Sequence, residues 1–115
     1  MSKRLALSEP YFSGHEWKLV KRCLDSGWVS SSGKFVKQFE DDVCRYVKAE
    51  HAVAVNSGTA ALHLALLVLG VKPGDEVIVP TVTFIAPVNA VAYVGAHPIF
   101  VDADRFYNID IAKTL

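Results

Sequence analysis

The chain has no long apolar run and no excess of charge of either sign. Its longest apolar stretch covers residues 60–69 and falls short of the ~18 residues that a membrane-spanning helix needs. Twelve basic residues balance twelve acidic ones, which excludes a nucleic-acid binder that works through a basic surface. No long apolar region follows the basic N-terminus, so we expect no secretory signal. These absences predict a cytoplasmic protein with no membrane or nucleic-acid partner.

Metal-binding and nucleotide-binding patterns are missing as well. Cys23 and Cys44 form no CxxC pair, and the four histidines have no metal-ligand spacing, so we expect reduced cysteines and no metal site. The chain contains neither GxGxxG nor GxxxxGKS/T, which argues against a dinucleotide fold and a P-loop. What is present is a 51% apolar composition over 115 residues, enough for one small folded domain.

The first half of the chain predicts two helices after an extended arm. Ser13 and Glu16 fit a capping box at the start of the first helix, and Gly27 fits its C-cap. Apolar residues recur at spacings of three and four over residues 34–48, which predicts the second helix. Glu40 falls on the charged face of that helix, and we expect Asp41 and Asp42, with Lys37 and Arg45, to form a solvated surface there.

The second half alternates short apolar runs with helical patterns. This alternation predicts an α/β fold in which helices cover a mainly parallel sheet. Three strands make a small sheet whose edges need cover, so we expect the front part of a larger domain. In chain order the expected elements are strand 52–55, helix 59–69, strand 76–79, helix 85–94, strand 97–101 and the start of a last helix from residue 108.

The transition from the first of these strands to its helix is the most informative feature. Asn56-Ser57-Gly58-Thr59 joins them in a tight turn, so the first amides and the positive dipole end of the helix form a natural anion site. Two hydroxyls add donors, and the glycine lets a ligand approach the backbone closely. The simpler alternative is a strand-to-helix turn in which Ser57 or Thr59 serves as the N-cap and nothing binds.

These residues and several further motifs resemble the DegT/DnrJ/EryC1/StrS aminotransferases. The resemblance covers nearly all 115 residues. It implies the N-terminal part of the fold type I large domain, a three-layer α/β structure that binds pyridoxal 5'-phosphate (PLP). The segments that carry the resemblance are Leu7–Tyr11, Gly27–Phe35, Asn56–His63, Pro73–Pro80, Thr83-Phe84, Asn89–Val91 and Gly95-Ala96.

The resemblance assigns a cofactor site and part of a substrate site. It implies that the aromatic ring of Phe84 stacks on the pyridine ring of PLP. Trp28 and Ser30 resemble residues that border the sugar-nucleotide pocket and the dimer contact. The positions that match the phosphate-holding turn are Ser57, Gly58, Thr59 and Ala60.

The resemblance also implies an activity, and it shows what this chain lacks. Family members aminate nucleotide-linked 4-keto-6-deoxy sugars for bacterial surface glycans, with glutamate as the expected amino donor, and they act as homodimers. The lysine that forms the Schiff base lies downstream in the family, and none of the eight lysines here has its context. We therefore expect no catalytic residue in this chain and an N-terminal fragment that is inactive alone. We divide it into an arm, first helix and loop over residues 1–33 and the start of the PLP-binding domain over residues 34–115.

Other interpretations remain open at this stage. A small α/β module could bind phosphate or nucleotide without chemistry, or helices within residues 13–48 could serve only as an interaction surface. Phe84 and His63 could be core residues. Asp102 and Asp104 follow a strand, where α/β sites gather, but helix capping or loop solvation explains them equally well.

Overall fold

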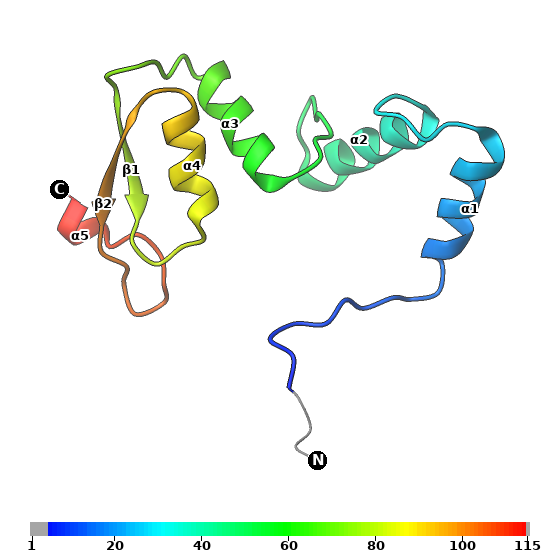
Figure 1. Cartoon of the computed structure of the whole chain (residues 1–115), viewed down its shortest axis with the longest axis horizontal. Coiled ribbons are helices and arrows are strands. Elements are labelled where there is room, and N and C mark those ends of the chain that lie inside the picture. The colour runs from blue at the N-terminus through cyan, green and yellow to red at the C-terminus, as the bar shows by residue number, and fades with distance from the viewer. Residues whose placement is uncertain (1–4, 115) are drawn as a thin grey trace. The chain divides into compact units, whose positions relative to one another are not determined.

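The computed structural model describes residues 5–114, and the chain divides into two compact units (Figure 1). Unit 1 is Met1–Ala54 and unit 2 is Val55–Leu115. The division at residue 33 stays a prediction. No helix within the described residues is long and apolar enough to cross a membrane.

Unit 1 consists of an extended arm and two helices, α1 (Glu16–Ser26) and α2 (Lys34–Val47). Glu16 reaches back as the capping box predicts, because its carboxylate accepts hydrogen bonds from the Ser13 and Gly14 amides at 2.9 and 2.8 Å. The Ser13 hydroxyl donates to the same carboxylate and does not cap the helix, so this part of the prediction is wrong. Gly27 closes α1 in the left-handed conformation, with φ of 71°, as predicted.

The predicted strand over residues 52–55 does not form within the described chain. A strand is defined by a neighbouring strand that exchanges backbone hydrogen bonds with it, and no described segment does so here. The amide of Ala54 instead donates to the Glu40 carboxylate of α2, at 2.9 Å. The Glu40 side chain is therefore partly buried against this segment, although it lies on the charged face of α2.

Unit 2 is built on a βαβ arrangement with one preceding helix (Figure 1). The two strands pair in parallel, with Ile78 opposite Ile99, so the α/β class and the parallel pairing are confirmed and the sheet has two strands where three were expected. Helices begin or end within a few residues of the predicted positions. The elements are α3 (Gly58–Val68), β1 (Glu76–Pro80), α4 (Ile85–Tyr93), β2 (His97–Val101) and α5 (Ile111–Thr114).

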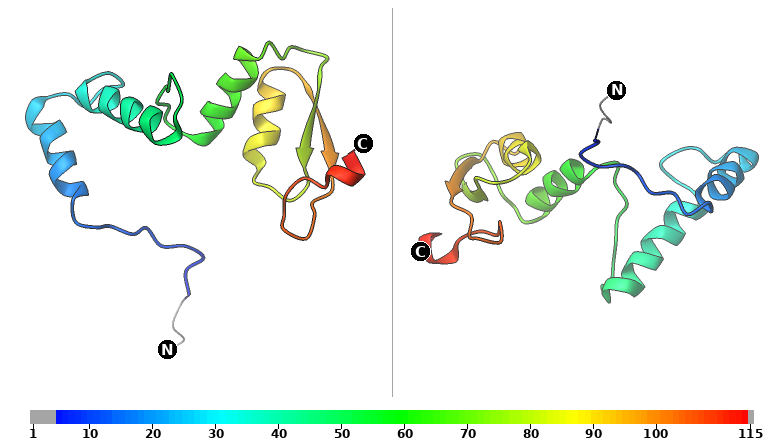
Figure 2. Two further views of the ribbon diagram at one scale, coloured as in Figure 1. Left: turned by 180° about the vertical axis from the view of Figure 1, so that it is seen from behind. Right: turned by 90° about the horizontal axis from the view of Figure 1, so that it is seen from below.

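The core of unit 2 lies between the sheet and its two long helices. α3 and α4 pack side by side and point the same way, opposite to β1, as seen in Figure 1 and in the left view of Figure 2. Side chains alternate along β1, so Val77 and Val79 face the helices and Ile78 faces away, where it is 48% exposed. The buried core residues of the described chain are Val79, Ala90, Val91, Val94 and Ala96.

Candidate functional site

The turn before α3 has the geometry of a capped helix start. Ser57 is extended, with φ of −161° and ψ of 159°, and its hydroxyl oxygen accepts a hydrogen bond from the Ala60 amide at 3.2 Å. Its carbonyl accepts the first helical bond, from the Ala61 amide at 3.1 Å. Ser57, and not Thr59, is therefore the N-cap.

This capping leaves two amides at the front of the helix for an external partner. The first amides of any α-helix have no intrahelical acceptor, and the Ser57 side chain satisfies only that of Ala60. The amides of Gly58 and Thr59 remain at the positive end of the α3 dipole, next to the Thr59 hydroxyl. A tetrahedral oxyanion such as phosphate matches this donor set.

Neither backbone conformation nor packing among the described residues explains the glycine at position 58. Its φ lies outside the left-handed region, so its backbone does not require glycine. Apart from its chain neighbours and the backbone of α3 itself, no described atom lies within 4 Å of the position that a Cβ would take, so packing among these residues does not require glycine either. Glycine within a helix costs roughly 1 kcal/mol relative to alanine. A ligand that approaches the turn closely accounts for a residue without a side chain at this position.

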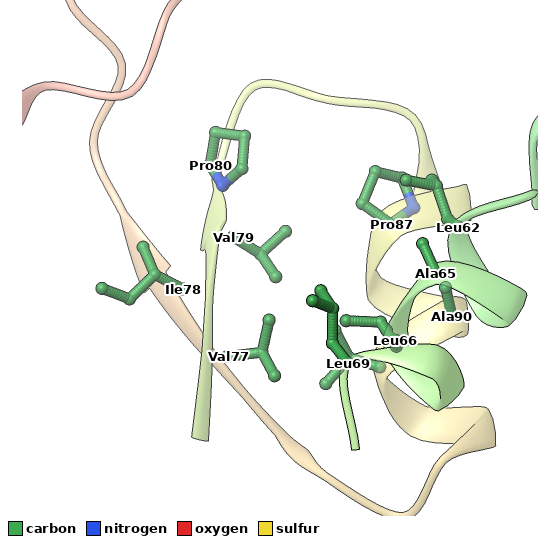
Figure 3. A pocket seen from close by; sticks show the side chains of 11 residues that line it. Leu62, Ala65, Leu66, Leu69, Val77, Ile78, Val79, Pro80, Pro87 and Ala90 are labelled. Atoms are coloured by element: carbon green, nitrogen blue, oxygen red, sulfur yellow. The ribbon is translucent and has the colours of Figure 1, made fainter. Parts of the chain in front are cut away.

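The turn and Phe84 lie at the same end of unit 2. Figure 3 shows Leu62 of α3 and Pro87 of α4 at the end where β1 finishes at Pro80. This end therefore carries the N-termini of two packed helices and the carboxyl end of a parallel strand. Ligands of open α/β sheets bind at such an edge, outside the carboxyl ends of the strands.

Phe84 sits at the N-cap of α4, in the loop that leaves β1. Phe84 is 89% exposed and is not part of the core of unit 2. The alternative that Phe84 is a core residue is therefore not supported within this unit. An exposed aromatic ring at the strand edge is free to stack on a flat heterocycle. Pro87 occupies the first turn of α4, where its missing amide breaks no helical bond.

The hollow in Figure 3 lies behind this edge and is apolar throughout. It has a volume of about 300 Å³ between α3, α4 and β1, and it offers no charged or hydrogen-bonding side chain. Charged ligands are therefore excluded from it. Its lining residues are Leu62, Ala65, Leu66, Leu69, Val77, Ile78, Val79, Pro80, Pro87, Ala90 and Val91.

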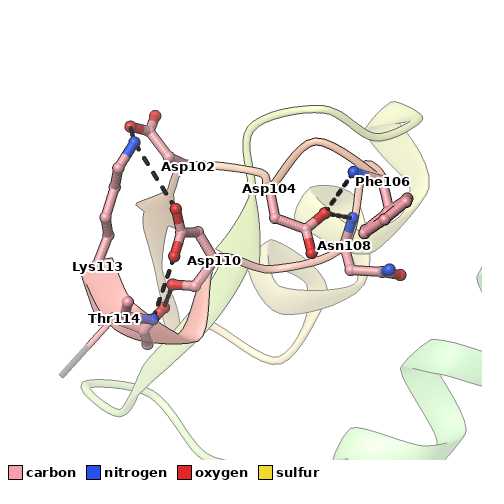
Figure 4. A network of polar contacts seen from close by, with 8 residues as sticks. Asp102, Asp104, Phe106, Asn108, Asp110, Lys113 and Thr114 are labelled. Carbon is pink, nitrogen blue, oxygen red and sulfur yellow. Dashed lines mark hydrogen bonds and ion pairs between the residues drawn. The ribbon is translucent and has the colours of Figure 1, made fainter.

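The aspartates after β2 have structural partners. Asp104 accepts hydrogen bonds from the Phe106 and Asn108 amides at 2.8 and 3.0 Å, which closes the loop (Figure 4). Asp102 forms an ion pair with Lys113 at 2.9 Å, and this hydrogen bond and charge raise the pKa of Lys113. The structure thus favours loop closure over ligand binding for both aspartates.

His63 also has a packing explanation. It is partly buried on α3, and its ring meets Tyr93 of α4 edge to face, with the ring centres 5.5 Å apart. Among the described residues, no group of three histidine, cysteine, aspartate or glutamate side chains is placed to hold a metal ion.

Trp28 and Ser30 lie in unit 1, in the loop between α1 and α2. The Trp28 side chain covers Gly33, whose φ is 147°, with ring atoms 3.7 Å from the position of a Cβ. The Ser30 hydroxyl donates to the Ser32 carbonyl at 3.3 Å. Trp28 remains 57% exposed, so the loop is ordered by its own contacts while much of the indole surface stays accessible.

Comparison with known proteins gives a family and a set of relatives. Residues 11–114 match the sequence profile of the DegT/DnrJ/EryC1/StrS aminotransferase family. The chain is 48% identical over 111 residues to the GDP-perosamine synthase of Caulobacter vibrioides, which covers 96% of the chain and 30% of that protein. The X-ray structure of an aminotransferase from Psychrobacter cryohalolentis matches with a TM-score of 0.77 and 40% identity, over 83% of the chain and 24% of that protein.

The structure of a dehydratase is similar to this chain as well. The Escherichia coli GDP-4-keto-6-deoxy-D-mannose-3-dehydratase with bound hydrated PLP has a TM-score of 0.81 and 32% identity, over 92% of the chain and 29% of that protein. The chain spans less than a third of the length of each of these relatives.

Proposed function

Because the chain belongs to the DegT/DnrJ/EryC1/StrS aminotransferase family, we propose that it forms the phosphate-binding part of a PLP-dependent sugar aminotransferase. Its substrate is a nucleotide-linked 4-keto-6-deoxy sugar, and glutamate donates the amino group. The product enters bacterial surface glycans, and the reaction takes place in the cytoplasm, where the two free cysteines stay reduced.

Different residues of unit 2 bind the phosphate and the ring of the cofactor. The phosphate accepts hydrogen bonds from the amides of Gly58 and Thr59 and from the hydroxyl of Thr59. Ser57 and Ala60 stabilise the turn, because the Ser57 hydroxyl oxygen accepts a hydrogen bond from the Ala60 amide. Phe84 stacks on the ring and fixes its plane. When bound, PLP supplies the electron sink that amino transfer requires.

Gly58 is the observation that carries this proposal. Neither its backbone conformation nor its surroundings in the chain require glycine, and the amides beside it have no helical acceptor. A phosphate seated on the turn accounts for both features at once.

We further propose that the chain contributes no catalytic residue and that it acts in a homodimer. Support for the dimer comes from unit 1, where no described residue is buried and large apolar side chains stay exposed. Surfaces of this kind mark interaction sites. Trp28 and Ser30 would border the sugar-nucleotide pocket near that interface.

The sequence identities to two relatives favour amino transfer over dehydration as the reaction. The chain is 48% identical to a GDP-perosamine synthase and 32% identical to the 3-dehydratase. The product of the reaction decides between them directly, because only amino transfer places nitrogen on the sugar.

The test uses the protein expressed from its complete open reading frame. We expect PLP to bind at least tenfold more tightly than pyridoxal, which lacks the phosphate, since charged hydrogen bonds are strong. Mass spectrometry should detect an amino sugar nucleotide formed from a GDP-linked 4-keto-6-deoxy sugar and glutamate. Equal affinity for PLP and pyridoxal would refute the phosphate site, and GDP binding without PLP binding would favour the non-catalytic module.

A substitution at Gly58 makes the test specific for the turn. Gly58→Leu meets no protein atom within 4 Å of its Cβ, so the chain should stay folded while the side chain fills the phosphate position. We expect PLP affinity to fall at least tenfold with an unchanged unfolding midpoint. The matched control is Ala61→Leu at an exposed position of α3, which should bind PLP normally.

A further inference from the structure

The contact between Glu40 and Ala54 joins α2 to the segment that leads into the turn before α3. The Glu40 carboxylate accepts the Ala54 amide at 2.9 Å across 14 residues of sequence, and the contact is partly buried. The neighbouring acids of α2 have ordinary helical partners: Asp41 pairs with Lys37 and Asp42 with Arg45, all of them exposed. Glu40 alone among these three acids reaches out of its own helix.

This hydrogen bond gives the backbone amide of Ala54 an acceptor within the described chain. A backbone amide removed from water needs an acceptor, and within the described chain no neighbouring strand supplies one. A carboxylate is a strong acceptor for an amide because its charge assists the bond. The Glu40 carboxylate therefore restricts the backbone conformation at Ala54.

We infer that Glu40 is a positioning residue for the turn Ser57–Ala60, which we call the phosphate turn. This inference rests on the proposed function. Ala54 precedes Ser57 by only three residues, and Ser57 must stay extended to cap α3 and leave the next two amides free. Fixing the backbone at Ala54 removes conformations in which the turn is disordered, so that phosphate binding does not have to order it. Because a carboxylate repels phosphate, the role that we assign to Glu40 acts through the backbone and not through contact with the ligand.

The experiment compares cofactor forms with and without phosphate in the protein from the complete open reading frame. Glu40→Leu removes the acceptor and should weaken PLP binding about tenfold while leaving pyridoxal binding unchanged, since pyridoxal makes no use of the turn. Glu40→Gln keeps an oxygen that can accept the Ala54 amide, and its PLP affinity should stay within about threefold of wild type. The matched control is Asp41→Leu, which removes an exposed acid from the same helix and should change neither affinity.

A second variant keeps the test decisive if the leucine variant does not fold. Glu40→Asp retains the charge but shortens the side chain, so it should lose the bond and reproduce the selective loss of PLP affinity. Equal weakening of PLP and pyridoxal would show a general structural role and overturn the inference, as would wild-type affinity in both the Leu and Asp variants. A glutamine variant as weak as the leucine variant would overturn it too, because the hydrogen bond would then not be the cause.

Failure of the inference is distinguishable from failure of the proposed function. A wild-type protein that binds PLP no better than pyridoxal refutes the phosphate site, and the role of Glu40 falls with it. A wild-type protein that prefers PLP, with Glu40 variants that keep the same preference, refutes the role of Glu40 alone.

Discussion

Gly95 provides the sharpest stability prediction, because its surroundings allow the cost of a methyl group to be worked out. It follows α4 with φ of 74°, a conformation that favours glycine. A Cβ on Gly95 would lie 2.9 Å from Cγ and 3.2 Å from Cβ of Pro73. The neighbours on either side, Val94 and Ala96, are buried in the core, so the backbone has little freedom to move away.

Two costs add in the Gly95→Ala variant. An alanine in the left-handed region loses about 1–2 kcal/mol. A contact this short with a proline ring, which cannot rotate aside, adds about 1–3 kcal/mol of overpacking. The lower entropy of the unfolded alanine chain offsets about 0.4–1 kcal/mol. We expect a net loss of about 1–4.6 kcal/mol.

Gly70→Ala is the matched control for this variant. Gly70 has nearly the same φ, 79°, but no atom lies within 4 Å of its Cβ position. Its net cost should be about 1 kcal/mol or less, because only the backbone term remains. The difference between the two variants therefore isolates the contact with Pro73.

Urea unfolding followed by far-ultraviolet circular dichroism measures both losses. In a double-mutant cycle, Pro73→Ala should recover part of the cost of Gly95→Ala, with a coupling of about 1 kcal/mol or more. Equal losses at Gly70 and Gly95, or a cycle with no coupling, would show that Pro73 does not restrict this turn.

Three smaller predictions follow from single hydrogen bonds. Ser57→Ala should lower the free energy of unfolding by about 0.5–1 kcal/mol and Ser57→Asp should not, measured by urea unfolding; equal losses would contradict the capping role. Hydrogen bonds from the Ser13 backbone first, then from its hydroxyl and from Gly14, lower the pKa of Glu16 to about 2. The contribution of the Glu16 carboxylate to the free energy of unfolding is therefore present above pH 4.5 and is lost as the pH falls toward 2. A carboxyl carbon titration by NMR should show that midpoint, and a midpoint near 4.5 would contradict it. Asp104→Ala should speed hydrogen exchange at the Phe106 and Asn108 amides, and unchanged protection would show that the carboxylate does not close the loop.

Local signals in the sequence predicted most of the helices. Gly27 marks the end of α1 and Ser57 the start of α3 because caps are made by residues within one turn of the helix end. The parallel strand pair follows from its apolar runs and the helix between them. The donor set of the phosphate turn was visible for the same reason, since it comes from consecutive residues.

Features that depend on distant parts of the chain could not be predicted in this way. The apolar run at residues 52–55 has strand composition, but a strand also needs a partner, and composition does not supply one. Glu40 sits on a charged helix face, and nothing in its periodicity indicates an acceptor for an amide 14 residues away. The free space around Gly58 likewise emerges only from the three-dimensional structure.

The central claim is that the turn before α3 holds the phosphate of PLP. The most direct measurement is a crystal structure of the protein, expressed from its complete open reading frame, grown with PLP. We predict phosphate oxygens within hydrogen-bond distance of the Gly58 and Thr59 amides and the Thr59 hydroxyl, with the pyridine ring against Phe84. Phosphate bound at another site, with both amides of the turn facing only water, would contradict the account.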